Sequence, residues 1–191
     1  MKKKLFLAST SPRRISLLKE HGIKFKKIKP EADEKSIERR MSGYDPVLIA
    51  QRLAYEKAFS VINKVKDGVI LGADTIVVYN GVILGKPSGI AVAKRTLSRL
   101  SGSTHRVITG IAMIDARSKT TILDAGISYV TFKKLTSAEI NAYVINNNVM
   151  DKAGAYAIQE GADPFVKSIK GSYYNIVGLP LELVKKRLAS F

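Results

Sequence analysis

The apolar residues of the chain follow two kinds of pattern, one typical of strands and one typical of helices. Short apolar clusters predict strands at 4–8, 23–29, 69–79, 82–84, 105–115, 122–133, 154–159, 165–169 and 174–177. Apolar residues spaced three and four apart predict helices at 12–20, 46–66, 88–100, 136–146 and 180–189. The polar segment 30–42 is predicted to be a loop. Because strand and helix patterns alternate without a repeat or a linker, the sequence predicts an α/β domain.

Residues at the ends of these segments support the boundaries. Ser11-Pro12 and Asp45-Pro46 each place a capping residue before a proline at the first helical position. Thr136 and Glu139 have the spacing of a capping box. Asn80-Gly81 is a strong signal for a tight hairpin turn.

The composition excludes several classes of protein. The chain has 191 residues, of which 46% are hydrophobic and 25% charged, values ordinary for a globular protein. No apolar run approaches the roughly 18–20 residues of a membrane span. The chain has no cysteine and two histidines, which excludes a disulfide scaffold, thiolate chemistry and a His-rich metal site. The apolar stretch near the start covers only 5–8, too short for a signal peptide, so we expect a cytoplasmic protein.

The net charge is +16, from 32 basic and 16 acidic residues. Residues 1–40 hold 13 of the basic and 5 of the acidic residues, which is half of the excess. A basic surface attracts polyanions such as nucleic acid or the phosphates of a nucleotide. A lysine-rich composition that merely keeps the protein in solution would look the same, so the charge alone names no partner.

The segment from Ser9 to Arg14 combines a strand end with a helix start. Hydroxyl groups of Ser9 and Ser11 and the guanidinium groups of Arg13 and Arg14 surround a helix N-terminus, where free N–H groups attract anions. This arrangement is typical of a phosphate site. The alternative is an ordinary capped helix with solvated arginines.

Two carboxylates, Asp74 and Glu34, stand where a metal-binding or catalytic role is favoured. Asp74 interrupts an apolar strand, and a buried carboxylate is costly unless it is paired or binds a metal. Glu34 lies in the acidic stretch 31–34, which is otherwise an ordinary polar loop. Since Mg²⁺ needs only one or two carboxylates plus substrate phosphates, Glu34 and Asp74 are candidate metal ligands.

Two further polar residues end apolar segments. Lys86 follows the predicted hairpin, where it can reach a phosphate or simply face solvent. Gln159 ends a predicted strand, and its amide can both donate and accept, as recognition of a base edge requires. A surface glutamine is the simpler alternative.

Together these segments resemble the Maf family of nucleoside triphosphate pyrophosphatases, once described as septum-formation inhibitors. The resemblance covers nearly the whole chain. It rests on motifs in a family-like order: Ser9 to Arg14, Asp33-Glu34, Glu56-Lys57-Ala58, Gly72 to Thr75, Gly85-Lys86-Pro87, Leu100-Ser101-Gly102 with His105 and Thr109-Gly110, Asp151 to Gln159, and Gly171 to Pro180.

The resemblance implies a single domain over 1–191 with an elongated, twisted, mixed sheet flanked by helices. Its two lobes would surround a cleft, as in inosine-triphosphate pyrophosphatases. The implied reaction is hydrolysis between the α- and β-phosphates, which yields a nucleoside monophosphate and pyrophosphate. Such a reaction depends on positioning and on neutralisation of the phosphate charge, and it implies a divalent cation, Mg²⁺ or alternatively Mn²⁺. A homodimer is the family expectation, and no membrane partner is expected.

The resemblance also implies a role for each candidate residue. Asp74 corresponds to the proton acceptor and, with Glu34, to a metal ligand. Phosphate binding falls to the cationic and hydroxyl side chains Ser9, Ser11, Arg13, Arg14, Lys57 and Lys86.

Base preference is assigned by the resemblance to Arg13, Thr75 and Gln159. The segment 151–159 looks like the branch acting on dTTP and UTP, with modified pyrimidine nucleotides as further candidates. Glu160 departs from the branch, which often has glycine after the glutamine, and it adds a carboxylate near the expected base pocket.

Two other functions stay open at this point. One is the same chemistry on 7-methyl-GTP. The other is a regulator of cell division or septum formation that binds nucleic acid or a protein partner through its basic surface. Against nucleic acid, no helix-turn-helix, zinc or aromatic-platform motif is present, although the charge keeps that partner open.

Overall fold

The structure is a computed structural model that describes residues 3–191. Met1 and Lys2, which begin the basic start considered above, lie outside the described residues. The strands are β1 (Leu5–Ala8), β2 (Lys26–Ile28), β3 (Val69–Tyr79), β4 (Val82–Leu84), β5 (Thr104–Asp115), β6 (Thr121–Phe132) and β7 (Val166–Lys170). The helices are α1 (Pro12–Glu20), α2 (Glu34–Arg40), α3 (Pro46–Phe59), α4 (Ile90–Leu100), α5 (Ser137–Asn146), α6 (Tyr173–Val177) and α7 (Leu181–Leu188). Shorter helical turns are η1 (Ile62–Lys64), η2 (Ala153–Ala155), η3 (Ile158–Ala162) and η4 (Asp163–Phe165).

The strands of residues 3–191 form one mixed sheet, which confirms the predicted α/β class. The order is β2-β1-β3-β5-β6-β7, and β4 pairs with β3 beside this path. β1 runs parallel to both β2 and β3, whereas β3 with β4 and β6 with β7 are antiparallel pairs. No helix among the described residues has the length and apolar character needed to cross a bilayer.

The chain divides into two compact units. Unit 1 comprises Met1–Thr75, Thr109–Gly126 and Gly178–Phe191, and unit 2 comprises Ile76–Ile108 and Ile127–Val177. The long strands β3, β5 and β6 therefore each contribute residues to both units.

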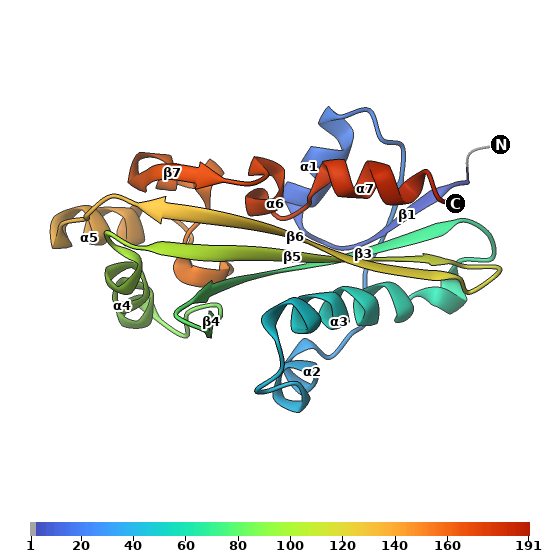
Figure 1. Cartoon of the computed structure of the whole chain (residues 1–191), viewed down its shortest axis with the longest axis horizontal. Helices are drawn as coiled ribbons and strands as arrows, with labels where there is room; N and C mark the ends of the chain where they lie inside the picture. The colour runs from blue at the N-terminus through green and yellow to red at the C-terminus, as the bar shows by residue number, and fades with distance from the viewer. Residues whose placement is uncertain (1–2) are drawn as a thin grey trace. The chain divides into compact units, whose positions relative to one another are not determined.

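Unit 1 is built around the packing of α3 on the sheet. Its buried core includes Ala54 and Ala58 of α3 with Ile70 of β3 and Ala112 of β5. The small alanine side chains let the helix approach the strands closely. Figure 1 shows α3 on one side of the unit 1 strands and α1 and α7 on the other.

Unit 2 has a separate core between α4, α5 and its part of the sheet. At its centre His105, which is 1% exposed, lies edge-on to the rings of Phe132 and Tyr156. His105 Nε2 is 2.7 Å from the Tyr156 hydroxyl, and its Nδ1 has no hydrogen-bond partner within residues 3–191. Burial lowers the pKa of His105 to about 4, so the ring is neutral near pH 7.

Because His105 is buried and neutral, we expect the free energy of unfolding to fall in mild acid. The unfolded chain binds a proton at this residue near pH 6.5, whereas the folded chain does so only near pH 4. The free energy of unfolding is therefore expected to fall by about 3 kcal/mol as the pH drops through this window. Urea unfolding at several pH values measures this slope, which His105→Gln is expected to remove. His21→Gln, which keeps His105, is the matched control, and an equal slope in wild type and His105→Gln would contradict the prediction.

Most predicted elements are confirmed, and three are wrong. The expected loop 30–42 contains α2, which starts where Asp33 caps the helix by accepting from the Ser36 N–H at 3.1 Å. The expected strand 154–159 is instead the irregular helical pair η2 and η3, and the expected strand 174–177 is α6. The expected strand 23–29 is confirmed only over β2, and the helix expected over 46–66 ends as α3 at Phe59, with η1 following.

Candidate active site

Helix α3 packs closely on β3 and β5, and this packing determines where its side chains lie. A Cβ added at Gly72 would stand 2.1 Å from the Ala54 carbonyl oxygen, and one at Gly110 would stand 2.3 Å from Ala50. The helix backbone therefore rests directly on the two strands, which only glycine permits. This contact carries Lys57, which lies between Ala54 and Ala58, over the middle of β3.

Lys57 joins two predicted carboxylates. Its Nζ donates to Asp74 Oδ1 at 2.6 Å and lies 3.1 Å from Glu34 Oε1. Lys57 is 7% exposed and Asp74 8% exposed, so each would be costly to bury without the other. The structure thus brings together three predicted site residues from α2, α3 and β3. We call this set, Glu34, Lys57 and Asp74, the carboxylate–lysine cluster.

The neighbouring residue Thr75 takes part in a different network. Successive side chains of a strand point to opposite faces, so Thr75 lies on the face of β3 opposite Asp74. Its Oγ1 accepts from Arg14 Nη2 at 3.0 Å and lies 2.9 Å from the hydroxyl of Thr109. Arg14 Nε also donates to the Gly178 carbonyl at 2.8 Å. Two nitrogens of Arg14 are thus already bonded within unit 1, so part of its guanidinium group holds Thr75 in place.

Burial also affects the charge of Arg14. Loss of solvation lowers the pKa of its guanidinium from the ordinary value, and the nearby Asp74 carboxylate opposes this effect. The phosphate contact predicted for Arg14 stays a prediction beside this structural role.

The segment from Ser9 to Ser11 follows the carboxyl end of β1, at the level of Asp74 on the neighbouring strand β3. Ala8, the last residue of β1, pairs with Gly72 in parallel register, two residues before Asp74. Ser9 is buried, and its Oγ accepts from the Ser11 N–H at 3.1 Å. Ser11 stands at the N-cap of α1 as predicted, but its side chain forms no capping hydrogen bond. The hydroxyl of Ser11 and the helix N-terminus, followed by the half-buried Arg13, are the groups that the phosphate prediction requires.

The remaining two predicted residues belong to unit 2. Lys86 is exposed just after β4, and Gln159 is exposed on η3. The Gly154 N–H donates to the Gly85 carbonyl at 3.3 Å, so the segment that leads to Gln159 lies beside the turn of Lys86. The structure thus places Lys86 and Gln159 on neighbouring segments of unit 2.

Sequence reasoning assigned no role to two residues that the structure places at these sites. Thr109 contacts Thr75, and its place in the Thr109-Gly110 motif is the sequence signal that could have indicated it. Lys152 is 3% exposed, between Asp151 and the apolar segment around Tyr156. A lysine followed directly by small and aromatic residues is the sequence signal that could have indicated it.

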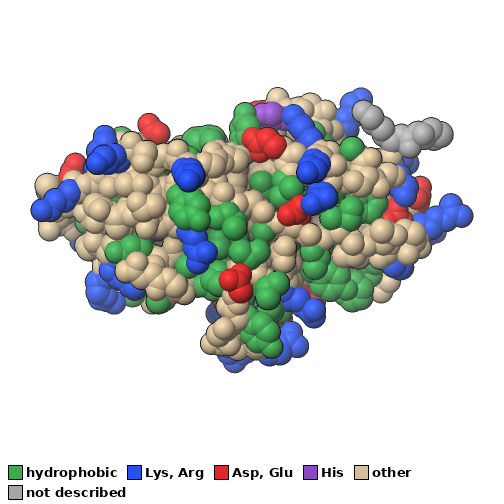
Figure 2. Space-filling model, viewed as in Figure 1, with side chains coloured by type: hydrophobic (Ala, Val, Ile, Leu, Met, Phe, Trp, Pro, Cys, Tyr) green, Lys and Arg blue, Asp and Glu red, His purple; other side chains and the backbone are tan. Residues whose placement is uncertain are grey.

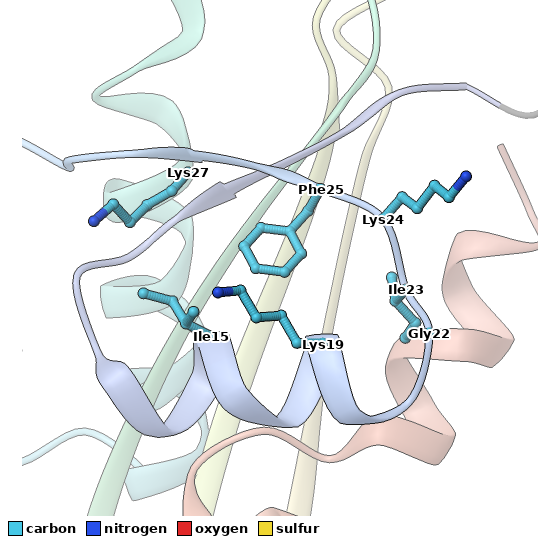
Figure 3. Close-up of a pocket in the computed structure, with 7 residues that line it drawn as sticks. All are labelled: Ile15, Lys19, Gly22, Ile23, Lys24, Phe25 and Lys27. Carbon is cyan, nitrogen blue, oxygen red and sulfur yellow. The ribbon is translucent and has the colours of Figure 1, made fainter.

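A separate pocket of about 600 Å³ lies beside α1 in unit 1, and none of the predicted site residues lines it. Figure 3 shows the Phe25 ring between α1 and the segment that leads into β2, alongside Lys19. The side chains of Lys24 and Lys27 point in opposite directions and do not converge on the pocket. This pocket therefore lacks the arrangement of cations that a phosphate site needs.

The basic residues do not form a continuous band on the face shown in Figure 2. Lys and Arg side chains are spread over this face, with apolar and acidic side chains between them. A nucleic-acid-binding surface typically gathers its cations along one face or helix.

Comparisons with known proteins agree with these observations. A family model described as Maf-like protein matches residues 4–191. A dTTP/UTP pyrophosphatase of Alkaliphilus oremlandii (strain OhILAs) is 47% identical over 180 residues, covering 94% of this chain and 91% of that protein. A dTTP/UTP pyrophosphatase of Clostridioides difficile (strain 630) is 43% identical over 186 residues, covering 95% and 94%. One of Bacillus cereus (strain AH820) is 43% identical over 190 residues, covering 99% and 96%.

Among the solved structures that match is a nucleoside-triphosphatase / dITP/XTP pyrophosphatase from Mycobacterium abscessus. It covers 98% of this chain and 95% of its own, with 13% identity and a TM-score of 0.46.

Proposed function

Because the chain belongs to the Maf family, as its motifs predict, we propose that it hydrolyses dTTP and UTP to the nucleoside monophosphate and pyrophosphate. The observation that carries the proposal is the carboxylate–lysine cluster beside the N-terminus of α1. Relatives named dTTP/UTP pyrophosphatase, each matched over more than nine-tenths of this chain, support the choice of substrate. The proposal takes 1–191 as one Maf-like domain with two lobes, cytoplasmic and homodimeric as the family suggests.

The donor groups of the cluster fit a divalent cation. Glu34 and Asp74 offer hard carboxylate oxygens, two negative charges against the single ammonium group of Lys57, and this charge balance supports a cation site. No group of three or more potential ligands from His, Cys, Asp or Glu exists in residues 3–191. A pair of carboxylates suits Mg²⁺, or alternatively Mn²⁺, because substrate phosphates complete its coordination. When bound, the cation supplies positive charge against the triphosphate.

The chain's own residues account for the remaining requirements. Ser9, Ser11 and Arg13 bind the phosphates at the N-terminus of α1, and Lys57, Arg14 and Lys86 add positive charge. Asp74 accepts the proton of the attacking water, since a carboxylate is the simplest general base in a chain without a histidine or cysteine motif. Arg13, Thr75 and Gln159 set the preference for the base, with Thr75 held by Arg14.

The proposal is tested by pyrophosphate release across a panel of nucleoside triphosphates with Mg²⁺. We expect release from dTTP and UTP, and not from ATP. Release confined to 7-methyl-GTP would keep the chemistry and contradict the substrate. No release from any nucleotide would contradict the proposal, and salt-sensitive binding of nucleic acid would then favour the regulatory alternative.

A further inference from the structure

Lys152 is a buried lysine on the segment that leads to Gln159. Its side chain is 3% exposed, whereas lysine is almost never buried unless its charge is paired. Its Nζ donates to Asp151 Oδ1 at 2.8 Å and lies 2.8 Å from Glu160 Oε2. The two carboxylates are 55% and 40% exposed, so the ammonium group holds them from inside the protein.

The charge of Lys152 is stable in this place. Burial disfavours the ammonium form, but the hydrogen bonds to Asp151 and Glu160 outweigh this and raise the pKa of Lys152 above its ordinary value. The ion pair therefore persists throughout the neutral pH range.

The two partners of Lys152 differ in what they connect. Asp151 is its neighbour along the chain, so this contact joins nothing distant. Glu160 lies on η3, eight positions further along, and directly follows Gln159. Its contact with Lys152 therefore joins the turn that carries Gln159 to the start of the segment 151–159.

The backbone of this turn is also tied. The Ala157 carbonyl accepts from the N–H groups of Glu160 at 3.0 Å and of Ala162 at 3.4 Å. The Ala157 N–H donates to the Tyr143 hydroxyl at 3.1 Å. The side-chain amide of Gln159 is exposed and forms no hydrogen bond with another of residues 3–191, so it is available for a ligand.

We infer that Lys152 and Glu160 are positioning residues that hold the Gln159 amide for recognition of the pyrimidine base. The inference rests on the proposed function, in which Gln159 contacts the base. The link between Lys152 and Glu160 places the backbone from which the Gln159 side chain extends, and a side chain meets a base edge only when its backbone stands at the right position. The carboxylate of Glu160, which the sequence adds near the expected base pocket, is bonded to Lys152.

The test compares UTP with CTP, whose bases differ at one edge, where an amide can distinguish a carbonyl from an amino group. Glu160→Gln removes the charge of the link. We expect the KM for UTP to rise about tenfold while kcat changes less than about twofold, since a displaced contact group weakens binding of the base. The ratio of kcat/KM for UTP over CTP should fall by about the same factor. Inhibition by inorganic tripolyphosphate, which has no base, should not change.

Asp151→Asn is the matched control, because it removes a carboxylate from the same ammonium group and leaves the contact between Lys152 and Glu160 in place. We expect its UTP/CTP ratio to stay within about twofold of wild type. Glu160→Asp, which keeps the charge but shortens the side chain, should give an intermediate ratio and replaces Glu160→Gln if that variant does not fold. Thermal unfolding by circular dichroism establishes folding for each variant.

The outcomes separate this inference from the proposed function. If Gln159→Ala lowers the ratio and Glu160→Gln does not, the positioning role is wrong. An equal loss in Asp151→Asn would also overturn it, because the effect would then come from the charge and not from the link. If Gln159→Ala leaves the ratio unchanged, both the role of Gln159 and this inference are wrong. Absence of pyrophosphate release by the wild-type protein would overturn the proposed function itself.

Discussion

Replacement of Asp74 by Asn is expected to lower kcat for pyrophosphate release about a thousandfold or more. Asn keeps the shape of the side chain but removes the negative charge, so it cannot accept a proton and binds a divalent cation poorly. The same change takes from Lys57 its nearer partner, since Asp74 Oδ1 is 2.6 Å from Nζ and Glu34 is 3.1 Å away. Steady-state release from dTTP with Mg²⁺ in excess measures the effect.

Asp33→Asn is the control for this experiment. Asp33 precedes Glu34, and its carboxylate accepts from the Ser36 N–H as the N-cap of α2. Asn caps helices about as well as Asp, so this variant should keep most of the activity. If Asp74→Asn keeps more than about a tenth of the wild-type rate, the essential carboxylate lies elsewhere, with Glu34 as the next candidate.

Gly72→Ala is expected to lower the free energy of unfolding by about 3 kcal/mol or more. The added Cβ would lie 2.1 Å from the Ala54 carbonyl oxygen and 2.9 Å from the Ala58 nitrogen, both of which are backbone atoms of a buried helix. Neither atom can move without shifting α3, and overpacking of this kind in a dense core typically costs this much. Urea unfolding monitored by circular dichroism measures the change.

Gly89→Ala is the matched control, because a Cβ at Gly89 would meet no atom within 4 Å. Its stability should differ from wild type by less than about 1 kcal/mol, because Gly89 is the N-cap of α4, where alanine is a poorer cap than glycine. A shift of α3 would also displace Lys57 from Asp74, so Gly72→Ala should lose activity even at temperatures where it remains folded. A Gly72→Ala protein as stable and active as Gly89→Ala would refute the close packing described for α3.

The sequence predicted the long elements well because their local signals agree. The Thr136 and Glu139 capping box forms with both hydrogen bonds, and β3 and β4 join at the predicted hairpin. The strands predicted at 154–159 and 174–177 are wrong for a common reason. Short apolar runs fit a buried strand and a buried helical turn equally well, and only tertiary packing separates them. Gly154 and Gly161, both with positive φ, belong to the irregular turns that replace the first of these strands.

The candidate site was predictable as a set of residues but not as an arrangement. The polar interruption of an apolar strand identifies Asp74, because a buried charge needs a partner, whereas Lys57 is indicated only by the resemblance to the Maf family. Their pairing depends on how closely α3 packs on β3, which no local pattern of residues encodes. Arg14 likewise donates both to Thr75 and to the Gly178 carbonyl, and this carbonyl lies 164 positions away along the chain.

The alternation of side chains along β3 limits which genetic changes this strand can accept. Gly72 and Asp74 face α3, while Thr75 contacts Arg14 from the other side. A one-residue insertion or deletion in this segment would exchange the two faces. Asp74 would then be turned toward Arg14, and a bulkier residue would meet the backbone of α3. We therefore expect the segment from Gly72 to Thr75 to tolerate some substitutions but no change of length. In a library of single-codon insertions and deletions, no variant altered in this segment should be both folded and active.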